Sequence, residues 1–146
     1  MADVAVAKYP ASKDEGSIVA LAMSNVKLYA GTMIGTNTAG YAVNGNDAAA
    51  DIKILGIATE TVDNSGGSAG ALKIKVKAGT FLLEHAGTIT QTMVGEVACS
   101  EFNYTLNIAA NCTHNNHAGM VVEYVSATQA WVKMGPAMAE NIVAAA

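Results

Sequence analysis

Residues 72–78 read Leu-Lys-Ile-Lys-Val-Lys-Ala, and this stretch decides the class of fold. Apolar and charged residues alternate with a period of two, which is the period of a β-strand whose successive side chains face opposite sides. A helix would place its apolar residues three or four positions apart. We therefore expect a half-buried strand in which Lys73, Lys75 and Lys77 form the solvated face. A binding site for an anionic partner is the alternative use of these lysines.

The same kind of signal continues on both sides of this strand. Between Gly31 and Gly79 the chain consists of short apolar segments separated by turns rich in glycine and asparagine. Residues 120–125 and 130–134 alternate around 126–129 and predict a hairpin. Further strands are expected at 18–23, 26–29, 40–43, 52–58 (with a bulge at Gly56), 80–84 and 92–99, and residues 102–108 are a short alternating segment.

Short strands at intervals of roughly eight to twelve residues are typical of sandwiches and barrels. We predict an all-β fold, a small β-barrel or β-sandwich of jelly-roll or tulip-like form, over residues 17–135. Residues 1–16 show no clear periodicity and are expected to form an extended, flexible N-terminal arm. Residues 136–146 are rich in alanine and are expected to form a C-terminal tail.

Composition argues against two classes of partner. The 146 residues are 51% hydrophobic and 14% charged, yet no apolar run approaches the roughly 20 residues that span a bilayer. The first residues also lack the pattern of a secretory signal. The net charge is −4, and all eight basic residues are lysines, whereas arginine is the preferred contact to phosphate and guanine. We therefore expect neither a membrane nor a nucleic acid as a direct partner.

The sequence predicts no catalytic or cofactor site. Cys99 and Cys112 are thirteen positions apart; a disulfide is conceivable, but inert thiols are the default for a chain without signs of an oxidising compartment. Cys112, His114 and His117 have a spacing that zinc or copper could use, but no fourth ligand is evident. A solvated loop is the favoured interpretation. No nucleophile elbow, phosphate-binding loop or dinucleotide fingerprint occurs, so we expect no enzyme, metal or cofactor.

Two aromatic residues belong to the predicted final hairpin. Tyr124 and Trp131 lie on its two arms, and cross-strand aromatic packing is the favoured interpretation. Exposed aromatic residues are also typical anchors of protein interfaces, so an interface role for this pair is the alternative.

The order of motifs over residues 26–79 resembles that of the small capsid cement (decoration) proteins of tailed bacteriophages and prophages. The motifs are Val-Lys-Leu-Tyr-Ala-Gly-Thr-Met-Ile-Gly, Gly-Tyr-Ala-Val, Ile-Leu-Gly-Ile-Ala-Thr-Glu, Asp-Asn-Ser-Gly-Gly and finally Leu-Lys-Ile-Lys-Val-Lys-Ala-Gly-Thr-Phe. The later Gly-Met-Val-Val-Glu and Ala-Trp-Val-Lys also resemble the closing hairpin of that family. The resemblance covers about residues 17–134.

The resemblance implies a β-rich, non-enzymatic virion protein, made in the host cytoplasm, that binds the outer surface of the capsid. Its partners would be the major capsid protein, whose subunit joints it reinforces, and further copies of itself, as a homotrimer or, second, a dimer. A virion-displayed module that binds a host surface or glycan is the alternative. The residues expected to contact the capsid or a neighbouring subunit are Val4, Val6, Tyr9, Pro10, Ile18, Tyr124 and Trp131.

Overall fold

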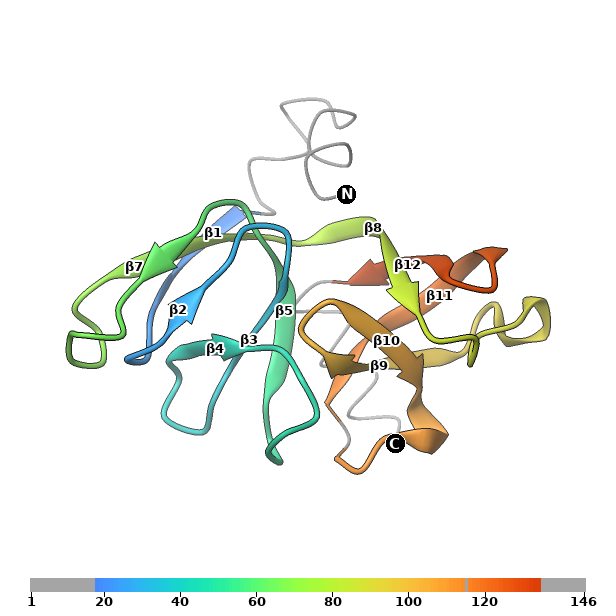
Figure 1. The fold of residues 1–146 in the computed structure, drawn as a ribbon, viewed down its shortest axis with the longest axis horizontal. Coiled ribbons are helices and arrows are strands. Elements are labelled where there is room, and N and C mark those ends of the chain that lie inside the picture. Colours follow the sequence, from blue (N-terminus) through green and yellow to red (C-terminus); the bar gives the residue numbers. More distant parts are fainter. Residues whose placement is uncertain (1–17, 115, 135–146) are drawn as a thin grey trace.

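The alternating stretch of lysines forms a strand that belongs to one of two linked β units. The computed structural model describes residues 18–114 and 116–134. An open five-stranded sheet and a closed five-stranded barrel lie side by side, with the sheet on the left and the barrel on the right of Figure 1. The expected all-β class with a small barrel is confirmed. The predicted arm and tail lie outside the described residues, so the domain boundaries stay predictions.

The open sheet has the strand order β1-β7-β5-β3-β4, with all neighbours antiparallel. An isolated bridge between Met23 and Ala42 connects its two outer strands at one end, so the sheet curls almost into a second barrel. A short ribbon of β2 and β6 covers part of it. The strands are β1 (Ile18–Ala22), β2 (Lys27–Leu28), β3 (Met33–Thr36), β4 (Ala42–Asn44), β5 (Lys53–Ala58), β6 (Val62–Asp63) and β7 (Lys73–Lys77).

The barrel closes in the order β10-β8-β12-β11-β9, and only the pairing of β10 with β8 is parallel. The predicted final hairpin is present as the neighbouring strands β11 and β12. The barrel strands are β8 (Gly79–His85), β9 (Val97–Phe102), β10 (Thr105–Ile108), β11 (His117–Ser126) and β12 (Gln129–Met134). Two 3₁₀ turns, η2 (Gln91–Met93) and η3 (Ala109–Asn111), connect them.

The two units are joined by one continuous length of chain, because only Ala78 separates β7 from β8 (Figure 1). Both ends of the described chain lie next to this junction. Ile18 at the start of β1 pairs with Lys77, and Met134 at the end of β12 pairs with Gly79.

A shared hydrophobic core also holds the units together. Met33, Ile52, Ile54 and Ile57 of the sheet region are buried in one cluster with the barrel interior, so the apolar faces of the two units cover each other. The barrel contributes Phe81, Leu83, Ile89, Ala98, Leu106, Ala118, Val121, Ala130, Val132 and Met134. A second, smaller cluster fills the curl of the open sheet: Met23, Leu28, Ile34, Ala42, Ala58, Ile74 and Val76.

The prediction of a solvated lysine face is correct for Lys73 and Lys75, which are exposed, and wrong for Lys77, which is only 1% exposed. Val76 and Lys77 are consecutive and both buried, so both faces of the strand are covered where it enters the barrel. In the sheet register Lys77 lies between β1 and β5. The alternation within β7 could not predict the burial of Lys77, because that burial depends on neighbouring strands and not on β7 itself.

The bulge predicted at Gly56 is confirmed, whereas the strand predicted over residues 92–99 is only partly correct. The bulge expected at Gly56 is present, because the β3–β5 register shifts where Ile34 opposes Gly56 and Gly35 opposes Ile54. The strand expected over 92–99 is wrong in its first half. There η2 is followed by Gly95 at a φ of 93°, a left-handed conformation that ends the turn before β9 begins.

Candidate functional site

Only part of the predicted contact surface falls on described residues. Val4, Val6, Tyr9 and Pro10 lie outside the described residues. Ile18 begins β1 and is 40% exposed, beside Val19 at 37%. Because β1 is an outer strand of the sheet, these apolar side chains lie at an edge that pairs only with β7 among the described strands.

The structure does not place Tyr124 and Trp131 directly opposite each other. A regular hairpin through the Ser126–Gln129 pair would do so, but a register shift between Tyr124 and Ser126 pairs Tyr124 with Ala130 and Trp131 with Glu123. Successive residues on a strand face opposite sides, so the two aromatic side chains belong to different faces of the hairpin. The expected cross-strand pair is therefore wrong. The ring of Tyr124 instead lies 6.5 Å from the imidazole of His85.

A pair of exposed aromatic rings that the sequence analysis missed lies at the β9–β10 turn. Phe102 and Tyr104 are 58% and 53% exposed, and their stacked ring centroids are 6.4 Å apart. Asn103 between them fixes the turn to the open sheet. Its carbonyl oxygen accepts a 2.7 Å hydrogen bond from the Met33 amide, and its side chain donates to the Asn44 side chain at 2.9 Å. We name Phe102 and Tyr104 the aromatic tip.

The sequence signal for this tip was the Phe-Asn-Tyr run between two apolar segments. Asparagine is a turn residue, so the two flanking aromatic residues could have been placed at a strand end. Their exposure depends on the fold, since the same run inside a longer strand would bury one ring.

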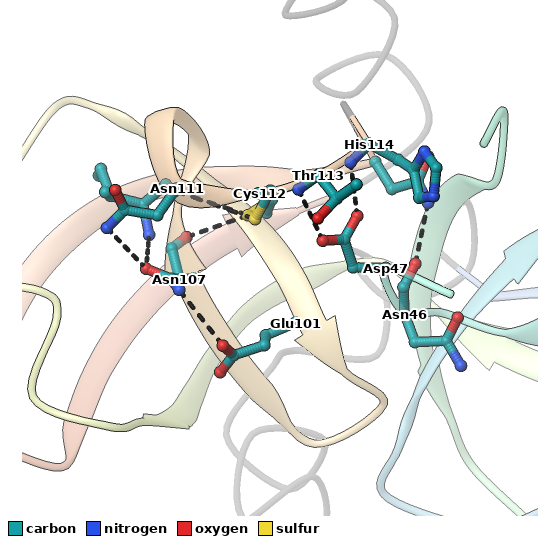
Figure 2. The surroundings of a disulfide bond; sticks show 11 residues. Asn46, Asp47, Glu101, Asn107, Asn111, Cys112, Thr113 and His114 are labelled. Carbon is teal, nitrogen blue, oxygen red and sulfur yellow. Dashed lines mark hydrogen bonds between the residues drawn. A yellow bond between two sulfur atoms is a disulfide. The ribbon is translucent and has the colours of Figure 1, made fainter. Parts of the chain in front are cut away.

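A disulfide joins Cys99 of β9 to Cys112, the residue after η3. Figure 2 shows the surroundings of this bond on the side of Cys112. Their Cα atoms are 6.6 Å apart, inside the range of disulfide-bonded pairs. The default expectation of inert thiols is thus corrected. The bond also removes the Cys112 thiolate from the Cys-x-His-x-x-His pattern. Within residues 18–114 and 116–134 no three His, Cys, Asp or Glu side chains are grouped to hold a metal ion.

The loop that follows Cys112 is held by a carboxylate from the open sheet unit. Figure 2 shows the Asp47 side chain directed at the backbone of this loop. Its two oxygens accept hydrogen bonds from the Thr113 amide at 2.8 Å and the His114 amide at 2.7 Å. The Asp47 amide in turn donates to the Glu101 carbonyl at 3.2 Å. Charged acceptors make hydrogen bonds about twice as strong as neutral ones, so this contact ties the two units firmly.

Asn116 completes the attachment from the barrel side. This side chain is only 2% exposed, and its amide nitrogen donates to the carbonyl oxygens of Asn46 at 2.9 Å and Ala49 at 2.7 Å. Its oxygen accepts from the Ile52 amide at 3.2 Å. Asp47 and Asn116 thus hold residues 46–52 of one unit against Thr113, His114 and Asn116 of the other. We name this pair the junction clamp.

A third polar side chain supports the disulfide itself. The Asn107 oxygen accepts from the Ile108 amide at 2.8 Å and from the Asn111 side chain at 3.3 Å, and its amide donates to Glu101 at 3.3 Å (Figure 2). These bonds fix the approach from β10 into η3, and therefore the position of Cys112.

Two histidines are buried in the barrel wall. His117 opens β11 opposite Cys99, and burial lowers the pKa of its imidazole below the usual 6.5. The Nδ1 atom of His85 accepts from the amides of Gly87 at 3.1 Å and Ile89 at 3.4 Å. Its Nε2 atom lies 2.9 Å from the Ser126 carbonyl oxygen, an arrangement that fits the neutral tautomer with hydrogen on Nε2.

No family model matches the chain, and a search of curated proteins finds no match. Among the described residues, no helix has both the length and the apolar character needed to cross a membrane. The features that stand out on the described residues are therefore geometric: an apolar edge at β1, an aromatic tip and a disulfide-braced junction clamp.

Proposed function

We propose that this protein is a non-catalytic capsid cement protein, which binds the outer surface of a tailed-phage head and stabilises joints between major capsid protein subunits. The observation that carries the proposal is the order of the motifs over residues 26–79. These motifs fall on consecutive elements from β2 to β7 and end at the start of β8, so they follow the open sheet region to its junction with the barrel rather than scattered parts of the chain.

The architecture supports this role physically. A shell protein must keep its shape when the surface beneath it is strained, and two units that share a strand, a core and a clamp resist relative movement. Many copies on a symmetric shell gain strength through multivalency even where each contact is weak. We propose a homotrimer as the bound form, with a dimer as the next choice.

The contact surface of the proposal includes the β1 edge. Ile18 and Val19 present apolar side chains there, next to residues 1–16, which are proposed to order along the capsid or an adjacent subunit. Removing residues 1–16 should then weaken head binding while the circular dichroism spectrum of the β domain stays unchanged. Full occupancy of heads by the truncated protein would refute the role of these residues.

Cryo-electron microscopy of heads incubated with the purified protein tests the whole proposal. Density at three-fold or quasi-three-fold joints supports both the cement role and the trimer. Density at two-fold joints supports the role and replaces the trimer by a dimer. Heads without added density, at protein concentrations well above the number of capsid sites, refute the proposal.

A second candidate function, a displayed module that binds a glycan or host surface, is favoured by the aromatic tip. Clustered, exposed aromatic side chains are typical of a surface that binds a partner, and Phe102 and Tyr104 are stacked and exposed together on one turn. A glycan array probed with the native chain and with F102A/Y104A examines this function. Binding that the double substitution abolishes, and that V94A on another exposed site leaves intact, supports the module; an array without binding refutes it.

A further inference from the structure

The disulfide and the junction clamp are arranged in series along one short segment. Cys112 is covalently fixed to β9, Thr113 and His114 donate to Asp47, and Asn116 holds residues 46–52. The segment then enters β11 at His117. The position of every clamp donor on this loop therefore depends on an anchor at each end, the disulfide and β11.

Without the covalent bond, the first anchor is weak. The remaining ties at that end include the 3.2 Å bond from the Cys112 amide to the Ala109 carbonyl and the 3.3 Å bond from the exposed Asn111 to Asn107. The Cys112 sulfur also lies 3.9 Å from the Ile108 carbonyl oxygen, a long and weak contact. Short 3₁₀ turns such as η3 have poor hydrogen-bond geometry and little stability of their own. A loop held in this way frays readily once its cross-link is opened.

We propose that the Cys99–Cys112 disulfide is a redox-sensitive lock on the junction between the sheet and the barrel. In the oxidised protein residues 109–114 and Asn116 of this loop are fixed, and the junction clamp holds residues 46–52. In the reduced protein this loop is released, Asp47 and Asn116 lose their partners, and residues 46–52 become free to move. The two units remain connected through the β7–β8 strand and the shared core.

The two cysteines differ in solvent exposure, which decides which sulfur the reductant attacks. Cys99 is completely buried, whereas Cys112 is partly exposed at the start of the loop. A thiolate of a dithiol reductant attacks Sγ of Cys112, the S–S bond breaks, and the electron pair passes to Sγ of Cys99, which takes a proton. The second thiol of the reductant then attacks the mixed disulfide. It releases Cys112 as a thiol and leaves the reductant oxidised to its own disulfide.

The lock would determine when a cement protein stiffens, and this timing rests on the proposed function. Disulfides rarely persist in a reducing cytoplasm and form readily outside the cell. A chain made in the host would thus bind heads with an adaptable junction and stiffen after release. Hydrogen–deuterium exchange tests the lock on the isolated protein, so a negative result there would not affect the outcome of the capsid experiment.

Hydrogen–deuterium exchange of the full chain, oxidised and after treatment with dithiothreitol, tests the lock. In denaturant, neither cysteine should react with an alkylating agent before reduction, and both should afterwards. We expect peptides that cover residues 46–52 and 109–116 to exchange about tenfold faster in the reduced protein. Peptides of β8 and β12 should change less than about twofold.

Two variants separate the lock from general destabilisation. C99A/C112A should show the fast exchange with or without reductant. Oxidised D47N keeps the disulfide but weakens the Asp47 half of the junction clamp. It should loosen residues 112–114 and leave the Ile52 amide protected by its hydrogen bond to Asn116. Equal exchange of residues 46–52 in both redox states, uniform acceleration across all peptides, or two alkylated cysteines before reduction would each overturn the proposal.

Discussion

Replacing Asn116 with alanine removes the side chain that ties residues 46–52 to the barrel, and the structure allows its cost to be estimated. Three hydrogen bonds are lost, to the carbonyls of Asn46 and Ala49 and from the amide of Ile52. A neutral hydrogen bond contributes about 1 kcal/mol net. The expected loss in the free energy of unfolding is therefore about 3 kcal/mol, since the buried site offers water little access to the groups left behind.

Urea denaturation of the oxidised protein, followed by the fluorescence of Trp131, measures this loss. For a chain of this size a loss of about 3 kcal/mol corresponds to a decrease in Tm of roughly 6–12 °C. The matched control is N111A, the same substitution in the same segment. Asn111 is exposed and makes one 3.3 Å hydrogen bond, so N111A should cost less than about 0.5 kcal/mol. The reasoning is refuted if N116A and N111A have equal unfolding midpoints.

Three further outcomes are expected from the same structure. The oxidised chain should be about 3 kcal/mol more stable than the reduced chain, because the disulfide closes a loop between cysteines 13 positions apart; identical urea curves with and without dithiothreitol would contradict this. G119A should lower the free energy of unfolding by roughly 2–4 kcal/mol, because a Cβ there meets the carbonyl oxygen of Lys133. G66A, where a Cβ would point into open space, should leave it unchanged, and urea denaturation of both variants measures the difference. Burial lowers the pKa of His117 below 6.5, so the unfolded chain takes up the proton first. Stability should therefore fall as the pH decreases below about 6.5, and less steeply in H117Q; an identical pH profile for the variant would show that His117 does not carry the effect.

The sequence predicted the elements whose signals are local. Alternation located β7, and the paired alternating segments located the final hairpin and its turn. It failed where a second unit changes the surroundings of a residue. Lys77 has the pattern of a solvated side chain but is buried, because the barrel begins two residues later. The register shift that separates Tyr124 from Trp131 is likewise not visible in the alternation of the two strands.

The junction clamp was beyond sequence reasoning for a similar reason. Asp47 and Asn116 are 69 positions apart, and each by itself is an ordinary loop residue that turn chemistry explains. The cysteine spacing likewise fits either thiols or a cross-link, and only the pairing of β9 with β10 brings Cys99 close to Cys112. Contacts between distant loops depend on the order in which the strands pair. The sequence predicted a barrel or a sandwich but not this strand order.

The single strand that runs from β7 into β8 has a consequence for protein engineering. Ile18 and Met134 pair with residues only two positions apart on this strand. Strand geometry therefore places them no more than about 12 Å from each other. A bridge of about four residues could join these ends, and the chain could then be reopened in the exposed 65–70 loop as a circular permutant. Cargo fused before Ile18 or after Met134 would be displayed from the same point on the protein, so two different fusion partners would be held as neighbours.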